Sequence, residues 1–195
     1  MTGMPVSEGS HGFPAGDADP CVVLARLSVE TFVATGRVAE VPSWVPEELL
    51  RRRAGAFVSL HERGELRGCI GTIGPVQGNL AQEIVRNGVL AASEDPRFPP
   101  VSSAELDFLS YSVDVLDAPE PVASPDQLDA RRYGVIVSKG FRRGLLLPNL
   151  EGVDTVAMQL AIAKRKAGID PDDQDVSIER FEVVRHERGG EARRG

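Results

Sequence analysis

The sequence has few cysteines and no long hydrophobic run, and each absence excludes a class of protein. Its 195 residues contain two cysteines, Cys21 and Cys69, which are too few for a disulfide scaffold and suit a reducing compartment. No apolar stretch approaches the ~20 residues that a membrane-spanning helix needs. The first residues also lack the charged and then apolar layout of a secretory signal. We therefore expect a cytoplasmic protein with no membrane association.

An excess of basic charge is missing as well. The formal net charge is -7, and a uniformly acidic surface repels phosphate backbones. Non-specific nucleic-acid binding is therefore disfavoured, unless arginines gather on one face. The hydrophobic and charged fractions are ordinary for a globular chain long enough to bury a core. We expect a flexible N-terminal tail over 1–18, one domain over 19–188 and a frayed C-terminal tail over 189–195.

Three segments combine helical periodicity with good capping residues. Asp19 and Pro20 are suited to begin a helix that stops at Gly36. Asn79 can cap a helix running to about Ser93, and Asp154 or Thr155 can cap one that ends at Gly168. The pattern also predicts a short helix over 46–54, with acidic residues in its first turn and arginines near its end.

Other segments have the period-two pattern of strands. The clearest is Leu109–Val115, in which Leu109, Tyr111, Val113 and Val115 would face the core and Ser110, Ser112 and Asp114 would face away. Two hairpins and a last strand are predicted over 56–60 with 66–70, 133–138 with 144–147, and 176–184. Hairpins mixed with helices, without regular βαβ units, predict an α+β fold in which helices pack on a mainly antiparallel sheet.

Cys69 is the residue most suggestive of chemistry. It stands between Gly68 and Gly71, which permit unusual backbone angles and a close approach by another group. Strict strand alternation would put Arg67 on the same face as Cys69, where its charge would favour the reactive thiolate. The competing interpretation is that Cys69 is a small buried hydrophobic residue. Both interpretations stay open at this point.

A histidine partner for Cys69 is not expected. In the predicted hairpin, His61 pairs near Leu66, which leaves roughly 10 Å along the strands and exceeds the ~3 Å reach of a general base. His11 and His186 are assigned to the chain ends. No CxxC, HxxxH or cysteine–histidine cluster has ligand spacing, so we expect no metal. The glycines after Cys69 match no phosphate-binding motif, and we expect no cofactor.

Cations stand on three segments that carry turn signals, namely Arg67, Arg97, Lys139, Arg142 and Arg143. Arginine guanidinium groups bind carboxylate or phosphate with two parallel hydrogen bonds. We therefore hypothesise a site for a small anionic ligand formed by Arg67, Arg97 and Arg143. The alternative is that these side chains are simply solvated, with Arg97 paired to Asp95.

Several motifs together resemble one known family. The segment Leu66-Arg67-Gly68-Cys69-Ile70-Gly71-Thr72 is similar to the signature of the AMMECR family, and three further segments follow in the family's order: Glu94–Pro100, Gly144–Pro148 and Lys166–Gly168. The resemblance spans about 19–188. Within the family, the stretch 150–156 is similar to the prokaryotic branch called AmmeMemoRadiSam system protein A.

The resemblance implies an α+β fold with a larger and a smaller lobe, and it implies a Memo-like protein and a radical SAM protein as partners. It does not imply a reaction. We interpret the chain as an enzyme or an enzyme accessory factor, with a non-catalytic interaction module and a nucleic-acid binder as alternatives. The candidate residues are Cys69 as a catalytic thiol and, for substrate binding, Arg67, Gly68, Ile70, Gly71, Thr72, Asp95, Arg97 and Arg143.

Overall fold

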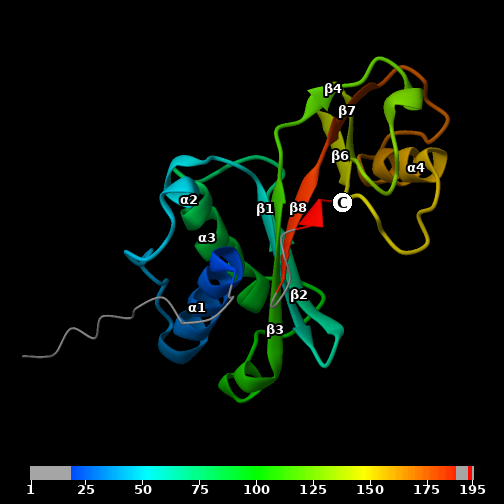
Figure 1. The fold of residues 1–195 in the computed structure, drawn as a ribbon. Helices are drawn as coiled ribbons and strands as arrows, with labels where there is room; N and C mark the ends of the chain where they lie inside the picture. Colours follow the sequence, from blue (N-terminus) through cyan, green and yellow to red (C-terminus); the bar gives the residue numbers. More distant parts are fainter. Residues whose placement is uncertain (1–18, 188–192, 195) are drawn as a thin grey trace, which may run out of the picture.

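The computed structural model describes residues 19–187 and 193–194. Within these residues the strands form two antiparallel sheets, here called sheet A and sheet B. Sheet A and three helices make the larger lobe, and sheet B and one helix make the smaller lobe at the upper right of Figure 1. The predicted α+β class and the two-lobed arrangement are confirmed.

The helices begin and end where their capping residues predict. Helix α1 spans Pro20–Thr35: Asp19 accepts from the backbone N–H of Cys21, and Gly36 ends the helix at a φ of 70°. Helix α3 spans Leu80–Ser93, and the side chain of Asn79 accepts from Gln82 N. Both predictions are confirmed.

The remaining helical elements are shorter. Helix α4 spans Val156–Lys166 and is capped by Thr155, whose hydroxyl accepts from Met158 N. Helix α2 covers Glu47–Arg51, less than the predicted 46–54, because Arg52 is already extended. Two 3₁₀ helices, η1 over Ser103–Phe108 and η2 over Pro125–Gln127, carry no hydrophobic periodicity and were not predicted.

Sheet A has the strand order β2-β1-β3-β8-β9. Its strands are β1 (Ala56–Glu62), β2 (Glu65–Gly71), β3 (Leu109–Leu116), β8 (Val183–Glu187) and β9 (Arg193–Arg194). The β1–β2 hairpin turns at Arg63 and Gly64, both with positive φ. Its register pairs His61 with Leu66, which confirms the pairing that separates His61 from Cys69.

One face of sheet A is covered by α1 and α3, and the main hydrophobic core lies between them (Figure 1). Val58, Leu60 and Val113 point into this core and are fully buried. The opposite face, here called the outer face of sheet A, carries the alternate residues of the same strands. Cys69 belongs to this outer face, because it pairs with Ser59, which alternates with Val58 and Leu60.

Sheet B has the strand order β4-β7-β5-β6 and packs on α4. Its strands are β4 (Glu120–Pro121), β5 (Gly134–Lys139), β6 (Arg142–Leu146) and β7 (Ser177–Phe181). The single strand predicted over 176–184 is wrong. The chain forms two strands that are interrupted at Glu182, with β7 in sheet B and β8 in sheet A.

A shared hydrophobic cluster joins the two lobes. Phe181, Ile136 and Leu145 of the smaller lobe pack with Leu116 and Val183, and Phe57 of β1 contacts this group. The outer face of sheet A therefore lies next to the lobe junction. None of the helices in the described residues is long and apolar enough to cross a bilayer.

Candidate functional site

A β-bulge in β2 changes where Arg67 points. Leu60 pairs with Gly68 and His61 pairs with Leu66, so Arg67 is the extra residue of the bulge. The strict alternation that would put Arg67 beside Cys69 is interrupted at this point, and that expectation is wrong. The Arg67 guanidinium instead pairs with Glu105 of η1 at 2.7 Å, and this contact holds the pKa of Glu105 down at about 2.

The two glycines of the motif are required by packing. A Cβ on Gly68 would lie 2.3 Å from the carbonyl oxygen of Ala91, so only glycine lets α3 pack this closely. A Cβ on Gly71 would lie 2.2 Å from the ring of Phe57. Gly68 therefore allows α3 to pack against the core face of β2, while Gly71 leaves space for the ring of Phe57 at the lobe junction.

Cys69 is half-buried, and both its side chain and its backbone are fixed. Ser59 Oγ donates to Cys69 Sγ at 3.2 Å across the hairpin. The backbone N–H of Cys69 donates to Asp95 Oδ2 at 2.8 Å, so the loop after α3 covers this free edge of sheet A. The motif cysteine is thus held from two directions.

Asp95 and Arg97 form a two-point ion pair next to Cys69. Arg97 Nε and Nη2 donate to the two carboxylate oxygens of Asp95 at 3.0 and 2.7 Å, and Nη2 also approaches the Cys69 carbonyl at 3.4 Å. Asp95 is buried, and the arginine holds the pKa of its carboxyl well below the usual range. Burial raises the pKa of Cys69, although Ser59 and the charge of Arg97 oppose this, so the free protein keeps the thiol protonated at neutral pH.

A second ion pair on the outer face did not follow from the sequence. Arg185 of β8 donates to both oxygens of Asp114 at 2.7 and 2.8 Å, and Asp114 is buried. Ser112 on the same face is buried too, so the expectation that only one face of this strand is covered is wrong. Register pairs Ser59 with both Cys69 and Ser112. We call Ser59, Cys69, Ser112, Asp114 and Arg185 the outer-face cluster.

Thr72, the last residue of the motif, belongs to a different network. Its hydroxyl donates to Glu83 Oε1 at 2.6 Å, and the other oxygen of Glu83 accepts from the backbone N–H of Val76 and Gln77. Glu83 is fully buried. This network anchors the loop between β2 and α3, which is the structural contribution of Thr72. Ile70 packs half-buried against the main core.

Arg143 lies apart from the other predicted site residues. It belongs to β6 of the smaller lobe, and its guanidinium pairs with Glu179 of β7 at 3.0 Å. No hydrogen bond or ion pair among the described residues joins Arg143 to Arg67, Arg97 or Cys69. The structure thus brings Cys69, Asp95 and Arg97 together directly and leaves Arg143 in the other lobe.

The histidines also differ from the expected picture. His186, which the sequence pattern assigns to a chain end, lies in β8, and its Nδ1 is 2.6 Å from Asp19 Oδ2. His11 lies outside the described residues. Neither His61 nor His186 forms a hydrogen bond with Cys69. No described histidine therefore serves as a base for this thiol.

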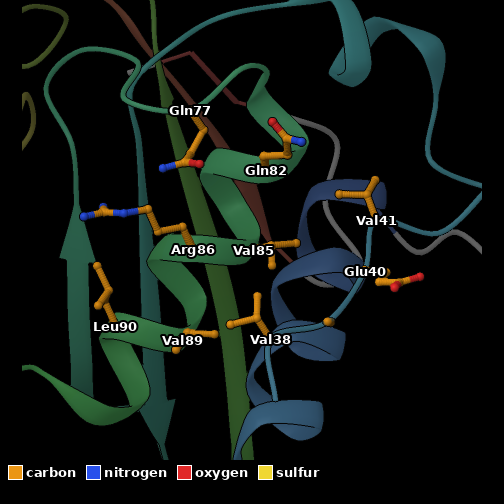
Figure 2. A pocket seen from close by; sticks show the side chains of 10 residues that line it. Val38, Glu40, Val41, Gln77, Gln82, Val85, Arg86, Val89 and Leu90 are labelled. Atoms are coloured by element: carbon orange, nitrogen blue, oxygen red, sulfur yellow. The ribbon is translucent and has the colours of Figure 1, made fainter. Parts of the chain in front are cut away.

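A groove of about 610 Å³ lies on the other side of the larger lobe. Figure 2 shows Val85 and Val89 of α3 facing Val38 in the segment that follows α1, with Gln77 and Gln82 at one end. None of the predicted site residues lines it. Because α3 covers the core face of sheet A, this groove and the outer-face cluster are separated by the sheet and its core.

The motif residues thus have defined positions, and comparisons with known proteins now show what the chain is similar to. The AMMECR1 family model matches residues 22–186. The chain belongs to the AMMECR1 family. A Thermotoga maritima relative is 57% identical over 86% of this chain and 97% of its own length. An uncharacterised Pyrococcus horikoshii protein of known crystal structure is 34% identical, has a TM-score of 0.78, and aligns over 90% of this chain and 94% of its own.

One relative places the AMMECR1 region in a longer chain. A Clostridium acetobutylicum protein is 52% identical over 87% of this chain, but the match covers only 36% of that protein. In that relative the AMMECR1 region is therefore joined to a large amount of other sequence. The family assignment confirms the resemblance that the motifs indicate, and it leaves the role of each motif residue to be argued from geometry.

Proposed function

We propose that this AMMECR1 protein is an enzyme or an enzyme accessory factor that binds a small anionic ligand at the outer face of sheet A. One observation carries the proposal: Cys69, Ser59 and Ser112 form a polar row across three neighbouring strands, on the face of sheet A opposite α1 and α3. A sheet face next to a lobe junction is a frequent place for a ligand site.

The cations near this row favour an anion. Arg97 is about half exposed although it pairs with Asp95, and Arg185 is about half exposed although it pairs with Asp114. Each arginine keeps N–H groups that its carboxylate does not use, because a guanidinium has five donors. The buried carboxylates hold the arginines in place, and the exposed sides of the guanidinium groups would meet the ligand.

Cys69 is the candidate catalytic group in this proposal. Its raised pKa means that the resting thiol is a weak nucleophile. A bound anion would disfavour the thiolate further, so we expect Cys69 to contact the ligand as a neutral group. Thiol chemistry would require the ligand or a partner protein to supply a base.

The test is a thermal-shift titration with phosphate and small carboxylates. We expect an anion to raise the melting temperature of the wild type, and Arg97→Gln and Arg185→Gln to reduce that shift at least several-fold. Arg143→Gln is the matched control because Arg143 lies in the smaller lobe, and it should keep the full shift. Arg97→Lys and Arg185→Lys provide milder variants if the glutamine proteins unfold.

Two outcomes would contradict the proposal. One is the absence of any anion-induced shift in the wild type. The other is a shift that Arg143→Gln abolishes and that the Arg97 and Arg185 variants retain. Such a result would place the binding site in the smaller lobe. Iodoacetamide adds a further check, since a ligand that covers Cys69 should slow alkylation of this thiol.

A second candidate function is a non-catalytic interaction module for a Memo-like protein and a radical SAM protein. The Clostridium acetobutylicum relative supports it, because there the matched region is only 36% of a longer chain. Gly68 and Gly71 are needed for packing and Thr72 for a hydrogen bond, so these motif residues have structural roles that fit a non-catalytic module as well. Co-purification of the three proteins tests it, and failure to form any complex would count against it.

Two further expectations belong to the same proposal. We place the protein in the cytoplasm, which agrees with two free cysteines in the described residues. Nucleic-acid binding loses support, because Arg143 lies in the other lobe from Arg67 and Arg97 and the net charge is -7.

A further inference from the structure

Three side chains with metal-binding atoms meet at the start of α1. Asp19 caps the helix, Cys21 lies in its first turn, and His186 reaches them from β8. The carboxylate oxygen, the thiol sulfur and the imidazole nitrogen all lie within 4.8 Å of one another. This cluster is separate from the outer-face cluster and is independent of the proposed function.

The three donors have the right chemistry for one ion. Thiolate, imidazole and carboxylate are the ligands that zinc takes in proteins, at about 2.0–2.3 Å, usually in a tetrahedral site. A mixed set of sulfur, nitrogen and oxygen disfavours Mg²⁺ and Ca²⁺, which prefer oxygen alone. We propose that Asp19, Cys21 and His186 form a three-ligand zinc site, with water as the fourth ligand.

The surrounding hydrogen bonds already orient two of the ligands. Asp19 Oδ1 accepts from the backbone N–H of Cys21, so the other oxygen, Oδ2, is the one directed at His186. His186 is held by the pairing of its strand, opposite Val113 of β3. Ligand residues fixed by neighbouring groups are typical of metal sites, because little order has to be gained on binding.

Only a small movement separates Asp19 and His186 from coordination, and the Cys21 sulfur lies within 4.8 Å of both donor atoms. His186 Nδ1 and Asp19 Oδ2 lie 2.6 Å apart, which is a hydrogen bond, whereas two ligands of one tetrahedral zinc are roughly 3.3 Å apart. Insertion of the ion replaces this hydrogen bond. The side chains of Asp19 and His186 are about 13% and 16% exposed, so the ion can enter from solvent.

The charges of the site balance. The positive end of the helix dipole opposes a cation. The carboxylate and the thiolate together supply two negative charges, which match Zn²⁺. Binding of the ion displaces the thiol proton of Cys21, which passes to the buffer.

The experiment uses the full chain, freed of metal by a chelator, with Zn²⁺ and Co²⁺ as probes. We expect one equivalent of Zn²⁺ to raise the melting temperature. Co²⁺ should give the absorption of a tetrahedral site with a thiolate charge-transfer band. Cys21→Ser should abolish the charge-transfer band, and His186→Ala should weaken binding of both ions at least tenfold.

Cys69→Ser is the matched control, because it removes the other described thiol and should leave the Co²⁺ spectrum unchanged. Three results would overturn the proposal: no stoichiometric binding to the wild type, a thiolate band that survives in Cys21→Ser, or a band that disappears in Cys69→Ser. The first result would mean that the Asp19–His186 contact is only a hydrogen bond between the N-cap of α1 and strand β8. Circular dichroism confirms that each variant is folded before binding is measured.

Discussion

The two lobes of this AMMECR1 protein differ in how deeply their ion-paired carboxylates are buried. In the larger lobe the carboxylates Asp95 and Asp114 are at least 95% buried, and each is bound by an arginine through two hydrogen bonds. In the smaller lobe the carboxylate of the comparable pair, Glu179 with Arg143, is about one third exposed. The exception there is Lys164, which is buried and donates to the backbone carbonyls of Pro171 and Asp173.

This difference indicates where the structure is most constrained. A buried carboxylate without its partner is strongly destabilising, whereas an exposed pair contributes little. The signature motif lies in the lobe with the buried pairs. The two lobes nevertheless pack a helix on a sheet in the same way, since Gly68 lets α3 approach sheet A closely and Gly144 lets α4 approach sheet B closely.

The largest expected loss of stability comes from substituting the two glycines at these helix–sheet contacts. Gly68→Ala places a methyl group 2.3 Å from a backbone oxygen of α3, and Gly144→Ala places one 2.1 Å from the carbonyl of Ala163 in α4. Each should lower the free energy of unfolding by about 3 kcal/mol, because a helix backbone has to move. Chemical denaturation followed by far-UV circular dichroism measures the loss.

Gly74→Ala is the control, since a methyl group there meets nothing within 4 Å. The cluster around Phe181 joins the lobes, so we expect each variant to keep a single unfolding transition. Two separate transitions in Gly144→Ala would show that the smaller lobe unfolds on its own, and the comparison would then be between two independent units.

The next effect concerns the buried pair beside the motif. Asp95→Asn removes the charge that binds Arg97 and weakens the acceptor for Cys69 N, so we expect a loss of roughly 2–3 kcal/mol at neutral pH. The pKa of Asp95 is lowered on folding, mainly by the hydrogen bond from Arg97. Its stabilisation is therefore complete above the unfolded value of 3.8 and declines as the pH falls below it.

The difference in stability between wild type and Asp95→Asn should accordingly shrink on acidification below pH ~4. Urea denaturation at a series of pH values measures it. A difference that stays constant down to pH ~2 would mean that the Asp95 carboxyl is not specially stabilised by Arg97, and the contrast between the lobes would lose its clearest case.

The smallest effect is expected in the smaller lobe. Glu179→Gln removes the partner of Arg143, and because this pair is exposed, the stability should change by less than about 1 kcal/mol. The change should also diminish in high salt. A loss as large as that of Asp95→Asn would remove the distinction between buried and exposed pairs.

Much of the fold is predictable because its signals are local. Asp19, Gly36, Asn79 and Thr155 cap helices through hydrogen bonds or backbone angles within a few residues. The hairpins follow from alternation and turn residues in the same way. The split at Glu182 was not predictable, because the residues before and after it have the same strand pattern although they join different sheets.

The candidate site was less predictable because it depends on long-range pairing. The Asp95–Arg97 pair is two residues apart and was anticipated, whereas Asp114 and Arg185 are 71 residues apart. The bulge at Arg67 breaks the alternation on which face assignment depends. The sequence pattern assigns His186 to a chain end. It gives no sign of the contact with Asp19, because the two residues are 167 positions apart in the chain.

The contact between Asp19 and His186 has a consequence for rearranged chains. It brings the first helix and the strand β8 together, so a short linker between these two points would close the domain into a ring. Circular permutation is tolerated where the original ends are close and the new ends fall in an exposed turn. The tip of the β5–β6 hairpin at Gly140 and Phe141 is such a turn. A permuted chain opened there would start in the smaller lobe and keep all of sheet B and four strands of sheet A, while the linker would replace β9.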